Sequence, residues 1–155
     1  MTLESLLSPE RVIANLSADE ATPAIHEMVS HLVEGGFIPS EMQDQVLEAL
    51  RRREEQRSTG IGNGIAIPHC FLENIDEVIT VFARSEKGVD FCSLDRGPVH
   101  FIVLFIVPQE QYTLHLKTLA AIAKILNSAD TRNNLAGADT PEQILEILSH
   151  RAAGV

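Results

Sequence analysis

The chain has 155 residues, 45% of them hydrophobic and 22% charged, which fits one globular domain with a substantial core. Its formal net charge of -10, from 22 acidic and 12 basic side chains, disfavours nucleic acid and anionic lipid as partners. The longest apolar run, residues 99–108, is too short to span a bilayer, and the N-terminus lacks the basic region of a secretory signal. We therefore expect one cytoplasmic domain over residues 1–155, without membrane insertion.

Two helices are predicted in the first third of the chain. Residues 3–16 are ambiguous between an early strand and a short helix. A helix begins near Thr22 and ends at Gly35-Gly36, with an apolar stripe of Ile25, Met28, Val29, Leu32 and Val33. A second helix begins at Ser40, where Gln43 is placed to complete a capping box. Its buried side consists of Val46, Leu47 and Leu50.

The middle of the chain predicts extended structure. Residues 59–69 begin as a turn-rich loop and become extended before Pro68, because the residue preceding a proline avoids the helical region. Strands follow near residues 78–83 and 100–107. The second of these is apolar on both faces, as expected of a central strand that helices cover on each side.

Two more helices are predicted towards the C-terminus. One spans about residues 111–127, with a core face of Leu116, Leu119, Ala120, Ala123 and Leu126. The last begins after Thr140, with Thr140 as N-cap and Pro141 in the first helical position. Helices and strands therefore interleave along the chain. This order predicts an α/β fold, a single-domain sandwich with a mixed parallel/antiparallel sheet flanked by helices on both faces.

The segment with the most chemical information is Gly60-Ile-Gly-Asn-Gly-Ile-Ala-Ile-Pro-His69. Its alternate glycines allow tight turns and leave backbone N–H groups open to an anion. The spacing does not match the dinucleotide fingerprint, because no helix can begin in Ile65-Ala66-Ile67-Pro68. It also lacks the Gly-Lys-Ser/Thr end of a P-loop. A tight turn, with or without a bound anion, is therefore the interpretation of the glycines alone.

His69 follows this segment on a stiff approach. A neutral imidazole nitrogen is nucleophilic at physiological pH and can accept a phosphoryl group. Such an acceptor needs cations or N–H donors nearby, which Arg53 and the glycine-rich loop would supply. If His115 abuts His69, it would donate an N–H to the phosphoryl oxygens or hold the imidazole tautomer. The other four histidines, His26, His31, His100 and His150, are interpreted as surface or structural residues.

Residues 58–69, Ser-Thr-Gly-Ile-Gly-Asn-Gly-Ile-Ala-Ile-Pro-His, resemble the active-site signature of the mannitol/fructose-class enzyme IIA domains of the bacterial sugar phosphotransferase system. They are most similar to the nitrogen-regulatory relatives. The resemblance covers nearly the whole chain. It includes Arg53-Glu54 before the signature, Asp95 with Pro98-Val99 before the core strand, and Val107-Pro108 followed by His115-Leu116.

This resemblance implies roles and partners. His69 would be phosphorylated by a histidine-phosphorylated HPr-type carrier, with His115 as the supporting histidine and Arg53 beside the site. Sugar-transporting members pass the group to a cysteine on an enzyme IIB domain. In nitrogen-regulatory members the phosphorylation state controls binding to regulatory targets, including potassium-transport and sensor-kinase proteins. The resemblance implies no cofactor and no metal.

Alternatives remain open within this interpretation. A chain without a fused IIB domain and the wording of the loop favour the regulatory branch over sugar transport. Cys70, where a small residue is common in relatives, is interpreted as a packing variation before a redox control. A zinc site built from His69, Cys70 and His115 lacks a further ligand. A hydrolase with Cys70 as nucleophile is disfavoured, because adjacent residues on an extended segment point to opposite faces.

Overall fold

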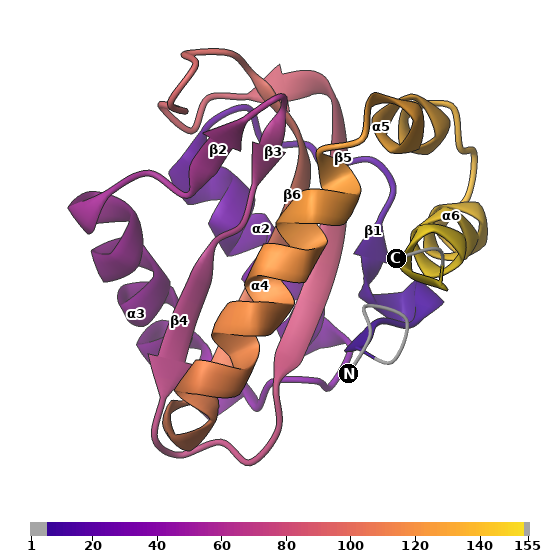
Figure 1. Cartoon of the computed structure of the whole chain (residues 1–155). Helices are drawn as coiled ribbons and strands as arrows, with labels where there is room; N and C mark the ends of the chain where they lie inside the picture. Colours follow the sequence, from indigo (N-terminus) through magenta and orange to yellow (C-terminus); the bar gives the residue numbers. More distant parts are fainter. Residues whose placement is uncertain (1–5, 154–155) are drawn as a thin grey trace.

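The computed structural model describes residues 6–153 and the side chains of residues 6–149 (Figure 1). Its helices are α2 (Ala21–Glu34), α3 (Gln43–Gln56), α4 (Tyr112–Leu126), α5 (Ala129–Ala136) and α6 (Pro141–Ala153). Its strands are β1 (Val12–Ile13), β2 (Gly60–Gly62), β3 (Ile65–Ala66), β4 (His69–Leu72), β5 (Ile79–Val89) and β6 (Val99–Pro108). Short 3-10 turns occupy Pro9–Arg11, Ser40–Met42 and Gln109–Gln111. The ambiguous opening segment therefore contributes a 3-10 turn and a two-residue strand.

The six strands form one mixed sheet in the order β1-β5-β6-β3-β2, with β4 also paired to β6. Strands β3 and β4 run parallel to β6, one after the other, and β5 runs antiparallel to it. Strand β1 is parallel to β5, whereas β2 and β3 form an antiparallel hairpin. The prediction that residues 100–107 form the central strand is confirmed. The mixed sheet is confirmed as well.

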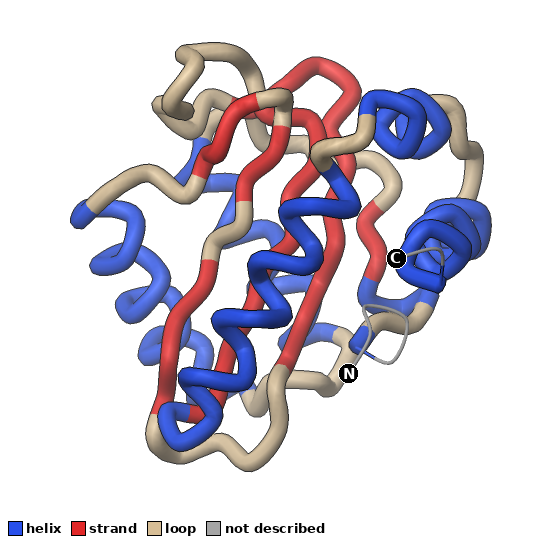
Figure 2. Tube along the Cα trace, viewed as in Figure 1, coloured by secondary structure: helices blue, strands red, loops and turns tan. Residues whose placement is uncertain are grey.

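Helices cover both faces of this sheet, as predicted (Figure 2). Alternate side chains of β6 point to opposite faces, which follows from the two-residue period of a strand. Ile102, Leu104 and Ile106 pack into the core beneath α2 and α3. Phe101, Val103, Phe105 and Val107 pack into the core shared with α4, α5 and α6. The side chains of both clusters are buried, so β6 packs against the helices on both faces of the sheet.

Several local predictions need correction. The second long helix begins at Gln43 after a 3-10 turn, and its N-cap residue Met42 makes no side-chain cap, so no capping box forms at Ser40. Helix α5 was not predicted. The Thr140 cap is confirmed, because Thr140 Oγ1 accepts a hydrogen bond from the Gln143 N–H at 3.2 Å.

Helix α4 also differs from the prediction, in the face that it buries. Its buried residues are His115, Thr118, Ile122, Ile125 and Leu126, whereas Leu116 is 43% exposed. The core face is therefore rotated away from the predicted stripe. Apolar side chains are left on the solvent side of α4.

Within the described residues, no helix is both long and apolar enough to cross a bilayer.

Candidate functional site

The glycine-rich segment folds into the β2–β3 hairpin. Asn63 and Gly64 form its two-residue turn with φ of 57° and 80°, the pattern of a type I′ turn. A Cβ on Gly60 would clash with the Ser93 side chain, so only glycine fits there. The predicted tight turn is confirmed. Two amides of the segment are engaged: the Gly60 N–H donates to Ser58 Oγ and the Asn63 N–H donates to Asp95 Oδ2, each at 3.0 Å.

His69 opens strand β4 and is fixed by two hydrogen bonds. Its Nδ1 lies 2.9 Å from the Ile67 carbonyl oxygen, which can only accept, so Nδ1 carries the proton. The Arg53 Nε–H donates to His69 Nε2 across 3.3 Å. Nε2 therefore holds the lone pair, and it lies beside a guanidinium cation.

A chain of hydrogen bonds connects α3 to this histidine. Glu54 on α3 accepts from the Thr59 hydroxyl and, at 3.2 Å, from the Thr59 N–H. The Thr59 carbonyl accepts from the Ile67 N–H at 3.1 Å, and the Ile67 carbonyl accepts from His69. The base of the hairpin thus fixes the imidazole orientation. The positioning role of Glu54 was missed, because a carboxylate near the end of a helix resembles an ordinary solvated residue.

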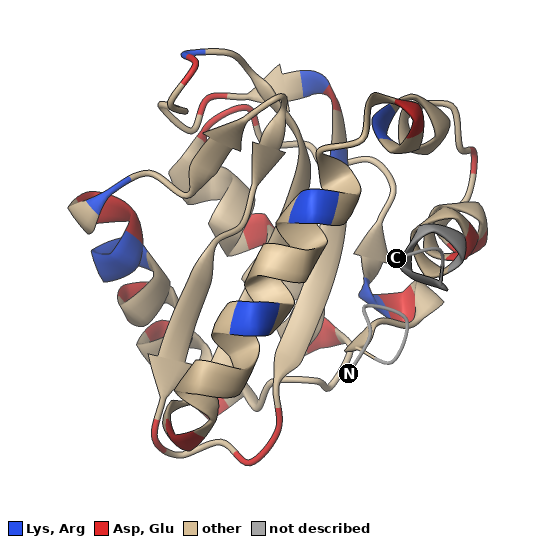
Figure 3. Cartoon of the chain, in the orientation of Figure 1, with Lys and Arg blue, Asp and Glu red and all other residues tan. Residues whose placement is uncertain are grey.

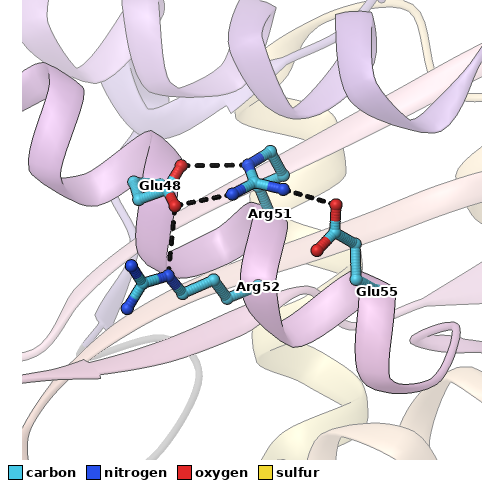
Figure 4. A network of polar contacts seen from close by, with 4 residues as sticks. All are labelled: Glu48, Arg51, Arg52 and Glu55. Carbon is cyan, nitrogen blue, oxygen red and sulfur yellow. Dashed lines mark hydrogen bonds and ion pairs between the residues drawn. The ribbon is translucent and has the colours of Figure 1, made fainter.

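The three consecutive arginines near the end of α3 have different surroundings. Arg51 and Arg52 pair with Glu48 at 2.6 and 3.1 Å, and Arg51 also pairs with Glu55, on an exposed face of the helix (Figure 4). Arg53 points elsewhere: besides His69 it donates to the Arg57 carbonyl at 2.6 Å. Exposed pairs contribute little to stability. They engage Arg51 and Arg52 on that face, whereas Arg53 bonds to His69.

A pocket of about 400 Å³ opens over His69. The base of the hairpin, the loop residue Leu94, and Leu119 and Ala120 of α4 form its walls. Arg53 and Arg57 also line it, and no acidic residue does. In Figure 3 basic and acidic positions alternate at the C-terminal end of α3, and separate basic positions lie along α4. In a chain of net charge -10, this pocket is locally cationic and suits an anionic group.

The environment of His69 keeps its ring neutral. Burial lowers the pKa of His69 below its usual value, and the positive charge of Arg53 acts in the same direction. The hydrogen bond to the Ile67 carbonyl opposes the shift. At neutral pH the imidazole is therefore a neutral base with an available Nε2 lone pair, which is the form that attacks an electrophile.

His115 does not line the pocket and does not hydrogen-bond to His69. It has no exposed surface, and its Nε2 lies 3.0 Å from Gln111 Oε1. Its Nδ1 has no hydrogen-bond partner, and burial lowers its pKa. Leu119, one turn further along α4, lines the pocket. The structure therefore brings Arg53 and His69 together, whereas His115 is buried on α4 and makes no hydrogen bond to either of them.

The remaining histidines have ordinary surroundings. His31 and His100 bond to the backbone carbonyls of Glu10 and Ser85 at 2.6 and 2.8 Å, and His26 is an exposed neighbour of Ser30. The His150 side chain lies outside the described residues.

Cys70 faces the opposite side of the sheet from His69. It is buried in the core beneath α2 and α3, and burial raises the pKa of its thiol to about 12. His69 and Cys70 therefore do not converge on a shared metal or on one nucleophilic centre. This geometry agrees with a packing role for Cys70 and gives no support to redox control.

The two free thiols should differ sharply in reactivity, because only the thiolate reacts and Cys92 alone is exposed. We expect one iodoacetamide adduct under native conditions, on Cys92, and two after denaturation. Peptide mapping of wild type and of Cys92→Ser measures this. Rapid native labelling of Cys70 in the Cys92→Ser protein would contradict the packing role.

Comparisons with known sequences give one consistent result. Residues 5–151 match the family described as "Phosphoenolpyruvate-dependent sugar phosphotransferase system, EIIA 2". A nitrogen regulatory protein of Pseudomonas aeruginosa is 35% identical over 146 residues, which cover 94% of each chain. The fructose-specific EIIABC component of Bacillus subtilis is 32% identical over 96% of this chain, which spans 23% of that longer protein.

A solved structure agrees with the sequence comparisons. The nitrogen regulatory protein IIA-Ntr of Neisseria meningitidis superposes with a TM-score of 0.85 at 25% identity, covering 94% of this chain and 98% of that one.

Proposed function

Because the chain belongs to the phosphoenolpyruvate-dependent sugar phosphotransferase system EIIA 2 family, we propose that residues 1–155 form one phosphocarrier domain that accepts a phosphoryl group on Nε2 of His69. The observation that carries this proposal is the pair of bonds on the imidazole. The Ile67 carbonyl holds the proton on Nδ1, and the lone pair of Nε2 accepts a hydrogen bond from the Arg53 Nε–H. A histidine-phosphorylated HPr-type carrier is the donor that the family resemblance implies.

The transfer follows from this geometry. The Arg53 Nε–H first leaves the Nε2 lone pair and turns to the phosphoryl oxygens. The Nε2 lone pair then attacks phosphorus and forms a new N–P bond, while the N–P bond on the donor breaks and its electron pair returns to the donor imidazole. The transferred oxygens carry negative charge throughout, so nearby cations stabilise the transition state. Arg53 supplies a positive charge beside the attacking atom, and Arg57 adds a second on the pocket wall.

We assign His115 a supporting role. The oxygens of a phosphoryl group on Nε2 lie beyond the imidazole ring and need further hydrogen-bond donors. Nε2 of His115 bonds to Gln111 at 3.0 Å, whereas its Nδ1 has no partner among the described residues, so Nδ1 once protonated is the nitrogen that can donate to the oxygens. His115→Ala then slows transfer while His69 remains available.

The surroundings of the pocket suit a protein partner. Leu94 and Ile61 are 70% and 41% exposed, and they line the pocket together with Leu119. Apolar side chains around a cationic centre fit a carrier that presents its phosphoryl group from an apolar face.

A charge placed on this rim should interfere with docking. Leu94→Glu is expected to raise the KM for the phosphorylated carrier about tenfold or more, because it buries a carboxylate at the interface and repels the phosphoryl group. Leu114→Glu is the matched control, since Leu114 is 49% exposed and does not line the pocket. Transfer kinetics at varied carrier concentration measure both. Equal KM values for the two variants would place docking elsewhere.

We propose that phosphorylation serves the nitrogen-regulatory branch and controls binding to regulatory targets such as potassium-transport or sensor-kinase proteins. The nitrogen regulatory protein of P. aeruginosa, similar over almost its full length, supports this assignment. Phosphorylation adds roughly -1.5 to -2 charges to a cationic pocket, enough to break one interface and favour another. The alternative is a sugar-specific IIA that passes the group to a IIB cysteine, which the fructose-specific relative supports.

One transfer assay tests the proposal and its alternative. The protein is incubated with a phosphorylated HPr-type carrier and examined by intact mass for an adduct that acid removes. The phosphorylated product is then offered to a fructose-type IIB domain. Labelling without onward transfer favours regulation, and rapid transfer to the IIB cysteine favours sugar uptake. If a cognate carrier does not label the protein, the proposed phosphocarrier function is ruled out.

A further inference from the structure

A second pocket, of about 510 Å³, lies between α5, the ends of β5 and β6, and the tip of the β2–β3 hairpin. We call it the α5 pocket. Its polar lining includes Asn15, Asn63, Arg84, His100, Arg132 and Asn133. None of its lining residues lines the pocket over His69. Its volume falls in the range of small-molecule sites.

Two guanidinium groups in this pocket lack an anionic partner. Within the described residues, ion pairs occur only among Glu48, Arg51, Arg52 and Glu55 of α3, so neither Arg84 nor Arg132 has a carboxylate within 4.0 Å. A single acidic residue, the exposed Glu86, lines the pocket. Positive charge therefore exceeds negative charge here, although the chain carries a net charge of -10.

Both guanidinium groups are held in place by backbone carbonyls. Arg84 Nε donates to Ala14 at 3.0 Å, and its Nη1 donates to Leu135 at 2.8 Å and also to Ala138. Arg132 Nη1 donates to Leu126 at 2.9 Å. These bonds fix the two cations without neutralising them. In both residues Nη2 makes no hydrogen bond to any described residue, so it remains available to a ligand.

We propose that the α5 pocket binds a small organic anion that carries at least one carboxylate or phosphate group. Nε and Nη2 of Arg132 bond to no described residue and form a planar fork that matches the geometry of either group. Nη2 of Arg84 adds a second cationic donor, which favours a ligand with more than one negative charge. The His100 ring and the Asn15 and Asn133 amides add hydrogen-bonding capacity for hydroxyl or carbonyl groups on the same molecule.

Isothermal titration calorimetry at fixed ionic strength tests this site. Citrate represents the carboxylates, glucose 6-phosphate represents the phosphates, and glucose is the uncharged control. We expect saturable binding of one equivalent of citrate or glucose 6-phosphate, and none of glucose. Which of the two anions binds identifies the preferred group. Absence of saturable binding by both anions at millimolar concentrations would overturn the proposal.

Variants locate the binding. Arg132→Gln and the isosteric Asn133→Asp should each weaken it about ten- to a hundredfold, because one removes a charged donor and the other adds a repelling charge. Lys87→Gln is the control: it removes one exposed positive charge nearby but does not line the pocket. Circular dichroism verifies folding. Unchanged affinity in both Arg132→Gln and Asn133→Asp would overturn the assignment, and His69→Ala should bind normally whatever its phosphoryl chemistry.

Discussion

His69→Ala is expected to abolish phosphoryl acceptance and leave the fold intact. The variant removes the nucleophilic Nε2, and no other described histidine lines the pocket. Among the described residues the half-buried ring bonds only to Arg53 and the Ile67 carbonyl, so its loss should cost about 1 kcal/mol of unfolding free energy. Intact mass after incubation with a phosphorylated HPr-type carrier measures acceptance, and thermal unfolding measures the fold.

The control for this variant is His26→Ala. His26 is exposed on α2, and its only hydrogen bond among the described residues is a long one, 3.4 Å, to Ser30. The His26→Ala protein should accept a phosphoryl group to the same extent as the wild type. Labelling of His69→Ala to the wild-type level would show that another residue carries the phosphoryl group.

The second large effect is expected from Arg53→Gln. Removing a preorganised cation from a site of developing negative charge typically costs about 10²–10³-fold in rate. Arg52→Gln is the matched control: it lies next in sequence, carries the same charge, and bonds to Glu48 on the exposed face of the helix. Single-turnover transfer should therefore be slow in Arg53→Gln and near normal in Arg52→Gln. Equal transfer rates in the two variants would show that Arg53 does not stabilise the transition state.

Arg53→Gln and Arg52→Gln should also differ in the pH dependence of phosphoryl acceptance by His69. Only neutral His69 can attack, and burial together with Arg53 lowers its pKa. In the wild type, acceptance should therefore persist somewhat below pH 6.5, the usual pKa of histidine, and fall as the ring is protonated. Without the Arg53 charge the pKa rises, although burial still lowers it. NMR titration should show the imidazole pKa higher in Arg53→Gln than in Arg52→Gln.

The central strand of the sheet was predictable because its residue pattern fits only one position in an α/β fold. Residues 100–107 are apolar on both faces, and only a central strand covered on both sides satisfies that pattern. The buried face of helix α4 was less predictable because the helix carries leucines on several of its faces. Leu114, Leu116 and Leu119 point in different directions, so the sequence does not decide which stripe is buried. The structure buries His115 and Thr118 and leaves Leu114 and Leu116 exposed.

The candidate site was predictable in its residue types and only partly in its geometry. Pro68 predicted a stiff approach to His69, and in the structure the ring bonds to the Ile67 carbonyl and to Arg53. The contact between His69 and Arg53, 16 residues apart, depends on how α3 packs against β4, which spacing alone does not determine. The glycines were expected to bind an anion because their amides seemed free in sequence. In the fold, Ser58 and Asp95 accept hydrogen bonds from this segment.

The assignment of the phosphoryl group to Nε2 of His69 is tested most directly by NMR of the phosphorylated, ¹⁵N-histidine-labelled protein. The bond from Nδ1 to the Ile67 carbonyl predicts a proton on Nδ1 and phosphorus coupled to Nε2 of His69. Coupling of phosphorus to Nδ1, or to a nitrogen of another histidine, would contradict the assignment.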